Sequence, residues 1–188
     1  MVMKRNNIQL VVLMLIALSC KTSKEIATAQ QYETFKALIA SQEFTIESDW
    51  AYPQLTNAMT QVLNSGLMGP NNNGNSINLI GNANFLTIKG DSITSYLPYF
   101  GERQMQVAYG GTDSAIQFNG VMEDLKIEDG KKNRKIFTFR AKSNAENFNV
   151  IITLFPNNTS QIVLNGNSRF SIQYSGQVKK ISQEEKTS

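Results

Sequence analysis

The sequence contains no histidine and only one cysteine, Cys20, among its 188 residues. Histidine is the commonest general base at neutral pH, so its absence excludes Ser-His-Asp and Cys-His catalytic systems and every zinc site that needs an imidazole. A single cysteine can form neither an intramolecular disulfide nor a thiolate zinc site. No P-loop, dinucleotide-binding fingerprint or calcium loop is present. We therefore expect neither a cofactor nor a metal, and carboxylates are the only catalytic groups left.

The net charge is also small. The formal charge is +3, but two basic residues, Lys4 and Arg5, precede Cys20, and no acidic residue does. Without residues 1–19 the basic count falls from 18 to 16, against 15 acidic residues, which is a net charge of +1. A nearly neutral protein has no electrostatic basis for binding nucleic acid, so we expect no such partner. The 41% hydrophobic and 18% charged residues are typical of one globular domain.

The amino-terminal residues have the organisation of a signal peptide. Basic residues are followed by an apolar run at 10–18, which is short for a bilayer crossing. The stretch Ala17-Leu18-Ser19-Cys20 resembles the lipobox of bacterial lipoproteins, with alanine where leucine is commonest. The resemblance implies that residues 1–19 are removed, that Cys20 is acylated, and that residues 20–27 tether the protein to a membrane. The alternative is an ordinary signal peptide or uncleaved anchor with an incidental cysteine.

The residues after Cys20 bear on which membrane this is. Position 21 is lysine rather than the aspartate that favours inner-membrane retention in enterobacterial lipoproteins, and no acidic run follows the cysteine. We therefore expect a cell-envelope protein on the periplasmic face of the outer membrane.

The hydrophobic pattern changes its period along the chain. Residues 26–40 have apolar positions three and four apart, which predicts a helix. Residues 43–50 alternate, with Phe44, Ile46 and Trp50 on one face, which predicts a half-buried strand ending at Pro53. Residues 54–68 fit either a short helix or a loop with a strand, and residues 69–76 form a loop rich in Asn and Gly.

Closely spaced strands separated by turn residues follow. Asn-Gly and Asp-Gly pairs between alternating segments are strong hairpin signals. The sequence therefore predicts a mainly β fold: an antiparallel meander sheet curled into a barrel or a two-layer sandwich, with one N-terminal helix. It would form a single domain over residues 28–182, followed by a polar tail at 183–188. The expected strands are 77–80, 84–89, 92–97, 104–109, 115–118, 121–128, 135–142, 147–155, 160–164, 169–174 and 177–181, with turns that include 119–120 and 175–176.

Two of these strands show which face is buried. Phe148, Val150, Ile152 and Leu154 alternate with polar residues, so they should face the core. Phe170, Ile172 and Tyr174 should likewise face away from Arg169, Ser171 and Gln173. The run at 131–135, KKNRK, is predicted to be a solvated hairpin tip, with contact to an anionic surface as the minor alternative.

The stretch from residue 77 to residue 111 resembles the bacterial family called domain of unknown function 4251 (DUF4251). The matching motifs are GDS at 90–92 followed by YLPYFG at 96–101, YGG at 109–111 followed by IQF at 116–118, and NSR at 167–169 leading to Gly176. The segment at 102–105, ERQM, departs from the family pattern. The resemblance covers about residues 30–180 and implies a lipoprotein of the Gram-negative envelope, with no assigned activity.

Two sets of residues are candidates for a site. Tyr96, Tyr99 and Phe100 surround Pro98, and we expect either an aromatic corner that packs the turn or an aromatic lip that binds a glycan or a small apolar ligand. Glu47 and Asp49 lie about 7 Å apart along one strand, a separation found in glycosidases, but alternate acids are usually the wet face of a strand.

The sequence therefore predicts a non-enzymatic envelope lipoprotein, anchored through Cys20, that binds an envelope protein, a glycan or a small apolar ligand. The alternative is a carboxylate-dependent hydrolase acting on envelope polysaccharide.

Overall fold

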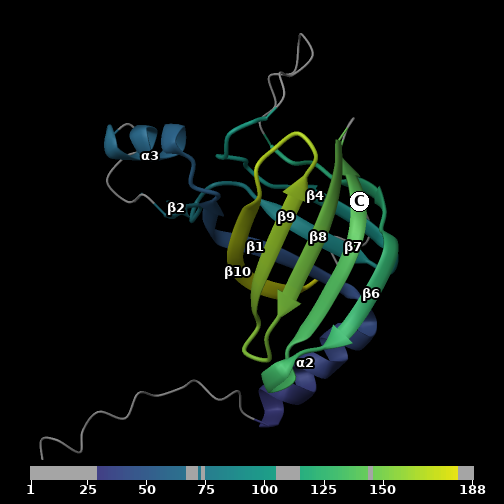
Figure 1. The fold of residues 1–188 in the computed structure, drawn as a ribbon. Helices are drawn as coiled ribbons and strands as arrows, with labels where there is room; N and C mark the ends of the chain where they lie inside the picture. Colours follow the sequence, from purple (N-terminus) through teal and green to yellow (C-terminus); the bar gives the residue numbers. More distant parts are fainter. Residues whose placement is uncertain (1–28, 67–71, 73–74, 105–114, 144–145, 182–188) are drawn as a thin grey trace, which may run out of the picture.

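The computed structural model describes residues 29–66, 72, 75–104, 115–143 and 146–181 (Figure 1). Within this part of the chain, short polar turns separate strands whose apolar residues alternate, as the period of two requires. The elements are α2 (Ala29–Ser41), β1 (Glu43–Pro53), α3 (Asn57–Asn64), β2 (Ile77–Asn78), β3 (Phe85–Lys89), β4 (Ser92–Tyr96), β5 (Asn119–Val121), β6 (Glu123–Asp129), the 3₁₀ turn η1 (Lys131–Asn133), β7 (Lys135–Ser143), β8 (Glu146–Leu154), β9 (Thr159–Gly166) and β10 (Ile172–Lys180).

The strands form one antiparallel sheet in the order β5-β4-β3-β1-β10-β9-β8-β7-β6, and the short β2 pairs with β1. The sheet curls until it is nearly closed into a barrel, and Figure 1 shows β7 and β8 crossing in front of β1. The predicted fold class, a mainly β fold with a helix near the N-terminus, is confirmed. Of its two predicted forms, the structure adopts the barrel.

The barrel closes where β5 and β6, the two edge strands, follow one another with only Met122 between them. β5 is hydrogen-bonded to β4, and β6 to β7. The residues just before β5 also contact β7 and β8. The backbone N–H of Gln117 donates to Ser143 Oγ at 3.1 Å, and the rings of Phe118 and Phe148 pack edge to face with centroids 5.6 Å apart.

A continuous hydrophobic core occupies the inside of the sheet and extends to α2 at one end. Phe35 and Leu38 of α2 are buried in it, because they lie three residues apart on one face of the helix. The predicted inward face of β8 is confirmed, since all four of its alternating apolar residues are buried: Phe148, Val150, Ile152 and Leu154.

Strand β10 corrects the prediction of two strands separated by a turn at Ser175-Gly176. It is continuous from Ile172 to Lys180, and Gly176 lies inside it, opposite Ser48 of β1. The register of β1 shifts between Ser48 and Trp50 at the same level. A Cβ atom at position 176 would lie 1.9 Å from the Glu47 carbonyl oxygen, so glycine permits a close approach of two backbones here.

Two side chains lie on a different face from the predicted one. Trp50 is half-buried, whereas Ser48 and Ala51 are buried, because the register shift in β1 interrupts the alternation. Arg169 was predicted to face water, but only 8% of it is exposed. Its position was wrong because β10 begins at Ile172, so residue 169 belongs to a loop without strand periodicity.

The remaining differences concern boundaries. Among the described residues, the predicted helix spans Ala29–Ser41, one residue beyond its predicted end, and its predicted start at residue 26 lies outside them. The ambiguous segment contains α3. Asn119 and Gly120, predicted to be a turn, begin β5. The expected strand at 104–109 and the YGG motif lie almost entirely outside the described residues, as do the predicted signal peptide, Cys20, the tether and the polar tail.

Candidate functional site

The LPYFG motif forms a corner after β4 that is held by backbone bonds on both sides. Leu97 exchanges two hydrogen bonds with Ile116, at 3.0 and 2.8 Å. The side chain of Tyr99 turns inward and is 6% exposed, and its hydroxyl lies 2.8 Å from the Glu102 carbonyl oxygen and 3.0 Å from that of Phe170. Gly101 is required here, because a Cβ atom would lie 2.4 Å from that hydroxyl.

An ion pair lies beside this corner. Arg169 Nε donates to Glu146 Oε2 at 2.9 Å, and the two side chains are only 8% and 11% exposed. The other carboxylate oxygen of Glu146 accepts the Ser168 amide at 2.9 Å. The guanidinium of Arg169 stacks over the Tyr99 ring, 5.0 Å from its centroid. We call Tyr99, Glu146, Ser168 and Arg169 the corner network.

Two tyrosines at this corner have raised pKa values. Burial raises the pKa of Tyr99 to about 12, and the nearby Arg169 charge opposes this in part. Burial also raises the pKa of Tyr174, whose hydroxyl donates to the Pro98 carbonyl at 2.8 Å. Both hydroxyls therefore remain protonated donors at neutral pH and fasten the LPYFG turn to the barrel.

The three aromatic candidates do not share one surface. Tyr99 is buried, Phe100 is half-buried against the core, and Tyr96 is 38% exposed on the opposite face of β4. The partner of Tyr96 across the sheet is Phe85 of β3, which is 40% exposed. Tyr99 thus packs the turn, while ligand binding by Tyr96 or Phe100 stays a prediction.

The two carboxylates predicted for the alternative function lie on β1. The Glu47 side chain is half exposed and forms an ion pair with Lys179 of β10. Asp49 lies at the register shift, and its carbonyl accepts the Leu79 amide at 2.8 Å. Neither residue lines the groove described next. Among the residues that the structure describes, no three acidic, Cys or His side chains gather as metal ligands.

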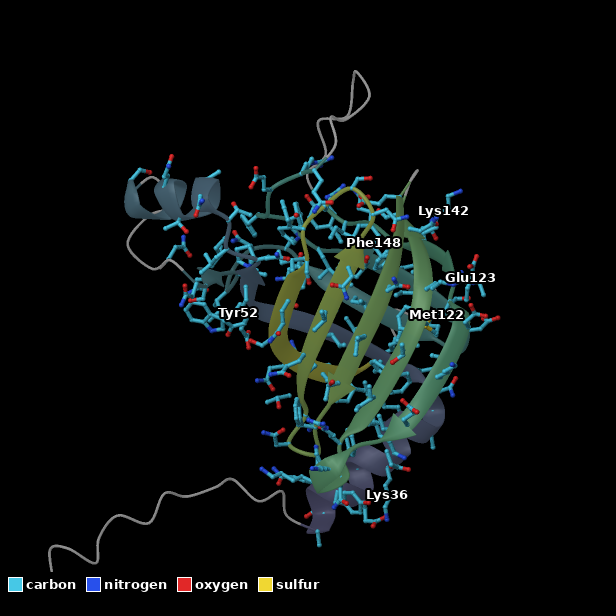
Figure 2. All side chains as sticks on the ribbon, in the orientation of Figure 1. Lys36, Tyr52, Met122, Glu123, Lys142 and Phe148 are labelled. Carbon is cyan, nitrogen blue, oxygen red and sulfur yellow. The ribbon has the colours of Figure 1, made fainter. Side chains whose placement is uncertain are left out.

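A polar groove of about 500 Å³ lies at the end of the barrel where β7 and β8 meet. Its lining includes exposed side chains at alternating positions of these strands together with the buried Ala141 and Phe148. Glu123 of β6 and Asn167 of the loop before β10 complete it. Figure 2 shows Glu123, Lys142 and Phe148 at this end, away from Lys36 of α2. The groove is lined by Glu123, Arg140, Ala141, Lys142, Asn147, Phe148, Asn149 and Asn167.

The corner network supports this groove on both sides. Glu146 directly precedes Asn147, and Asn167 directly precedes Ser168. The ion pair between Glu146 and Arg169 therefore fixes the backbone beside two groove residues. Within the groove region, Arg140 pairs with Asp124 at 2.5 Å and approaches Glu123 at 3.5 Å, so two carboxylates lie beside its guanidinium.

Sequence reasoning did not single out the groove. Most of its polar residues belong to the outward half of an ordinary alternating pattern in β7 and β8, which is normally just the solvent-exposed face. The available signal was the number of asparagines at 147, 149, 165 and 167, at one end of adjacent strands. The family motif NSR was noted, but its link to Glu146 depends on tertiary contacts.

The fold and the corner define this protein as a small, nearly closed antiparallel barrel with a helix across one end. The family model called Domain of unknown function (DUF4251) matches residues 27–178, so the chain belongs to this family, and the resemblance of the motifs is confirmed. The LPYFG and NSR motifs on which the resemblance depended are the two segments that the corner network joins.

A solved relative has the same fold. It is a DUF4251 family protein from Bacteroides eggerthii DSM 20697, whose crystal structure was determined at 1.95 Å resolution. The two chains share 16% sequence identity with a TM-score of 0.53, and the match covers 82% of this chain and 90% of that one. At this identity the likeness shows the fold alone. No curated protein matches the sequence.

Proposed function

We propose that this protein is a non-enzymatic, lipid-anchored protein of the cell envelope whose barrel binds a glycan. The observation that carries the binding proposal is the polar groove over β6, β7 and β8. Three asparagine side chains and Lys142 face this space. Each asparagine offers both a carbonyl acceptor and an amide donor, which is the pairing that the hydroxyl groups of a sugar require.

The groove suits a ligand that is polar throughout. Its exposed lining residues are charged or amides, whereas a site for a small apolar ligand is lined mainly by hydrophobic and aromatic side chains. Because Arg140 is already paired with acids, Lys142 is the cation available to a ligand. The preferred ligand is therefore a neutral sugar or one that carries a single carboxylate.

The anchoring proposal comes from the sequence around Cys20. A basic segment, an apolar run and a small residue precede this cysteine, and no second cysteine could pair with it. Acylation of Cys20 would place the protein on a membrane surface, which we propose is the periplasmic face of the outer membrane. Among the described residues, no helix has the length and apolar character needed to cross a bilayer.

Metabolic labelling tests the anchor. Cells that express the full chain are fed an alkyne-tagged fatty acid, and the purified protein is examined for the tag. The wild type should be labelled and Cys20→Ala should not, while both remain expressed. Labelling that survives the substitution would refute the lipoprotein proposal.

Saturation-transfer NMR with soluble oligosaccharide fragments of the envelope tests the groove. Each substituted asparagine removes hydrogen bonds to the ligand, so Asn147→Ala with Asn149→Ala should weaken binding about tenfold or more. Gln161→Ala is the matched control, because Gln161 is an exposed amide on β9 that does not line the groove. If the groove variant binds the same fragments as tightly as the control, the assignment of the site is wrong.

The same fragments also test the hydrolase alternative. Hydrolysis of a fragment by the wild type that Glu47→Gln with Asp49→Asn abolishes, in a protein with an unchanged unfolding midpoint, would overturn the non-enzymatic proposal. We expect no hydrolysis in any of these samples, because Glu47 is paired with Lys179 on the outside of the sheet.

A further inference from the structure

The end of the barrel opposite the groove contains α2 and the hairpin between β6 and β7. Phe44, three residues after α2, packs edge to face on Phe137 of β7, with ring centroids 5.8 Å apart. Phe137 is in turn two residues after the start of β7, so the hairpin tip lies at the same end as α2 (Figure 1). Lys142 of the groove lies seven residues after Lys135, the first residue of β7, which is about 23 Å at the strand rise.

The tip of this hairpin presents two exposed lysines. Lys131 and Lys132 form η1 with Asn133, and all three are exposed. Lys132 and Asn133 have φ values of 60° and 58°, so the chain turns sharply at the tip. The ion pair of this hairpin joins Lys135 to Asp129. Within the described part of the chain, no ion pair includes Lys131 or Lys132.

The predicted anchor is attached to the same end. Eight residues separate Cys20 from Ala29, where α2 begins. Even a fully extended segment of that length reaches only about 30 Å. An acylated Cys20 would therefore keep the start of α2 within about 30 Å of the bilayer surface, so that the two lysines can contact that surface.

We propose that Lys131 and Lys132 dock the α2 end of the barrel on anionic phospholipid and so turn the groove away from the membrane. The proposal rests on the proposed anchoring at Cys20. The anchor supplies attachment, and the lysines supply orientation: each basic residue near an anionic surface favours the docked state about fivefold. Glu128 and Asp129 on the same hairpin reduce the attraction, but Asp129 is already paired with Lys135. Docking would leave the groove open to ligands in the periplasm.

Fluorescence quenching in proteoliposomes tests the orientation. The acylated full protein is reconstituted in vesicles of phosphatidylcholine alone, or with phosphatidylglycerol, both containing a headgroup-attached nitroxide quencher. Because acylation blocks the single native cysteine, a dye can be placed at the tip with Asn133→Cys or at the groove end with Asn167→Cys. In phosphatidylglycerol vesicles the tip dye should be quenched strongly and the groove-end dye weakly.

Two comparisons attribute the effect to the lysines. Lys131→Gln with Lys132→Gln should lower the ratio of docked to undocked protein by about 25-fold. Lys126→Gln is the matched control, because Lys126 is an exposed lysine within β6, away from the tip. High salt should also abolish the difference between the two dyes, because exposed charges are screened. Equal quenching at both ends, in protein that floats with the vesicles, would overturn docking while leaving the anchor intact.

A second measurement tests docking by the two lysines separately from acylation of Cys20. If Cys20 carries no lipid, the unacylated protein should still sediment with excess phosphatidylglycerol vesicles more than Lys131→Gln with Lys132→Gln does. No difference between them would overturn the proposal. A tip dye that responds to a soluble sulfated polysaccharide but not to these vesicles would also overturn it, in favour of a polyanion partner.

Discussion

At the scale of single residues, Arg169 shows what the NSR motif does in this corner. Its guanidinium is paired with Glu146 and stacked on Tyr99, and both charges are almost fully removed from water. A buried pair of this kind contributes little net stability compared with apolar side chains of similar volume. The ion pair instead determines position: it holds the LPYFG turn and the loop that contains Asn167 in place relative to each other.

Breaking this pair on one side should be strongly destabilising. Arg169→Met leaves the Glu146 carboxylate buried without a counter-charge, so we expect a loss of about 3–5 kcal/mol in the free energy of unfolding, measured by urea denaturation. Arg169→Met with Glu146→Gln should lose clearly less. Arg140→Met is the control, since its pair with Asp124 is exposed and should change stability by less than about 1 kcal/mol. A similar small loss for Arg169→Met would show that the corner does not depend on the pair.

The two corner tyrosines predict the response to alkaline pH. Their pKa values are raised in the folded state, so above about pH 10 the unfolded chain loses protons that the folded protein keeps. Stability is therefore unaffected below pH 10 and falls as the pH rises toward 12, by up to about 1.4 kcal/mol per pH unit for each tyrosine. Urea midpoints across this range measure the slope. Tyr99→Phe with Tyr174→Phe should flatten it, and an unchanged slope would contradict this origin.

The sequence predicted the aromatic corner but not which ring lies inside it. LPYFG contains proline and glycine, so no period of two connects Tyr96, Tyr99 and Phe100 to a known face. The inward direction of Tyr99 is decided by the carbonyls of Glu102 and Phe170, and Phe170 is 71 residues away. Such contacts leave no local signal, and the burial of Arg169 was missed for the same reason.

At the scale of elements, Gly176 shows how one residue allows two strands, β1 and β10, to approach closely. The sequence located most strands correctly, because turn residues separate clear alternations. It divided β10, however, because Ser-Gly is typical of turns as well as of bends within strands. Only the pairing with β1, whose register shifts at the same level, distinguishes these two uses.

Adding a single methyl group at this point should disturb both strands. Gly176→Ala places a Cβ atom 1.9 Å from the Glu47 carbonyl oxygen, which belongs to the backbone and cannot rotate away. We expect a loss of about 3 kcal/mol in the free energy of unfolding, measured by urea denaturation. Gly120→Ala, on edge strand β5 with open space around the added atom, should be neutral or slightly stabilising. Equal midpoints for the two variants would mean that β1 and β10 can separate at the bend without cost.

At the scale of the whole molecule, alternation predicted the buried faces but could not decide between a barrel and a sandwich. The choice depends on how the two ends of the sheet come together. Here β5 and β6 are neighbours along the chain, and the residues just before β5 contact β7 and β8. The α2 helix completes the same core from the open end. The molecule should therefore behave as one cooperative unit from α2 at one end to the corner network at the other.

A substitution in α2 tests whether the molecule unfolds as one cooperative unit. The only tryptophan of the sequence lies near the far end of β1, so its fluorescence follows unfolding of the barrel at a distance from the helix. Trp50 pairs with β2, well beyond the segment of β1 that follows the helix. Leu38→Ala removes a buried side chain from α2, so we expect a loss of about 2–3 kcal/mol. The urea transitions followed by Trp50 fluorescence and by far-ultraviolet circular dichroism should shift together. Ala37→Gln, on the exposed side of the same helix, should leave both transitions in place. A fluorescence transition that stays fixed while the circular dichroism transition moves would show that α2 unfolds separately, as a helix docked on an independently stable barrel.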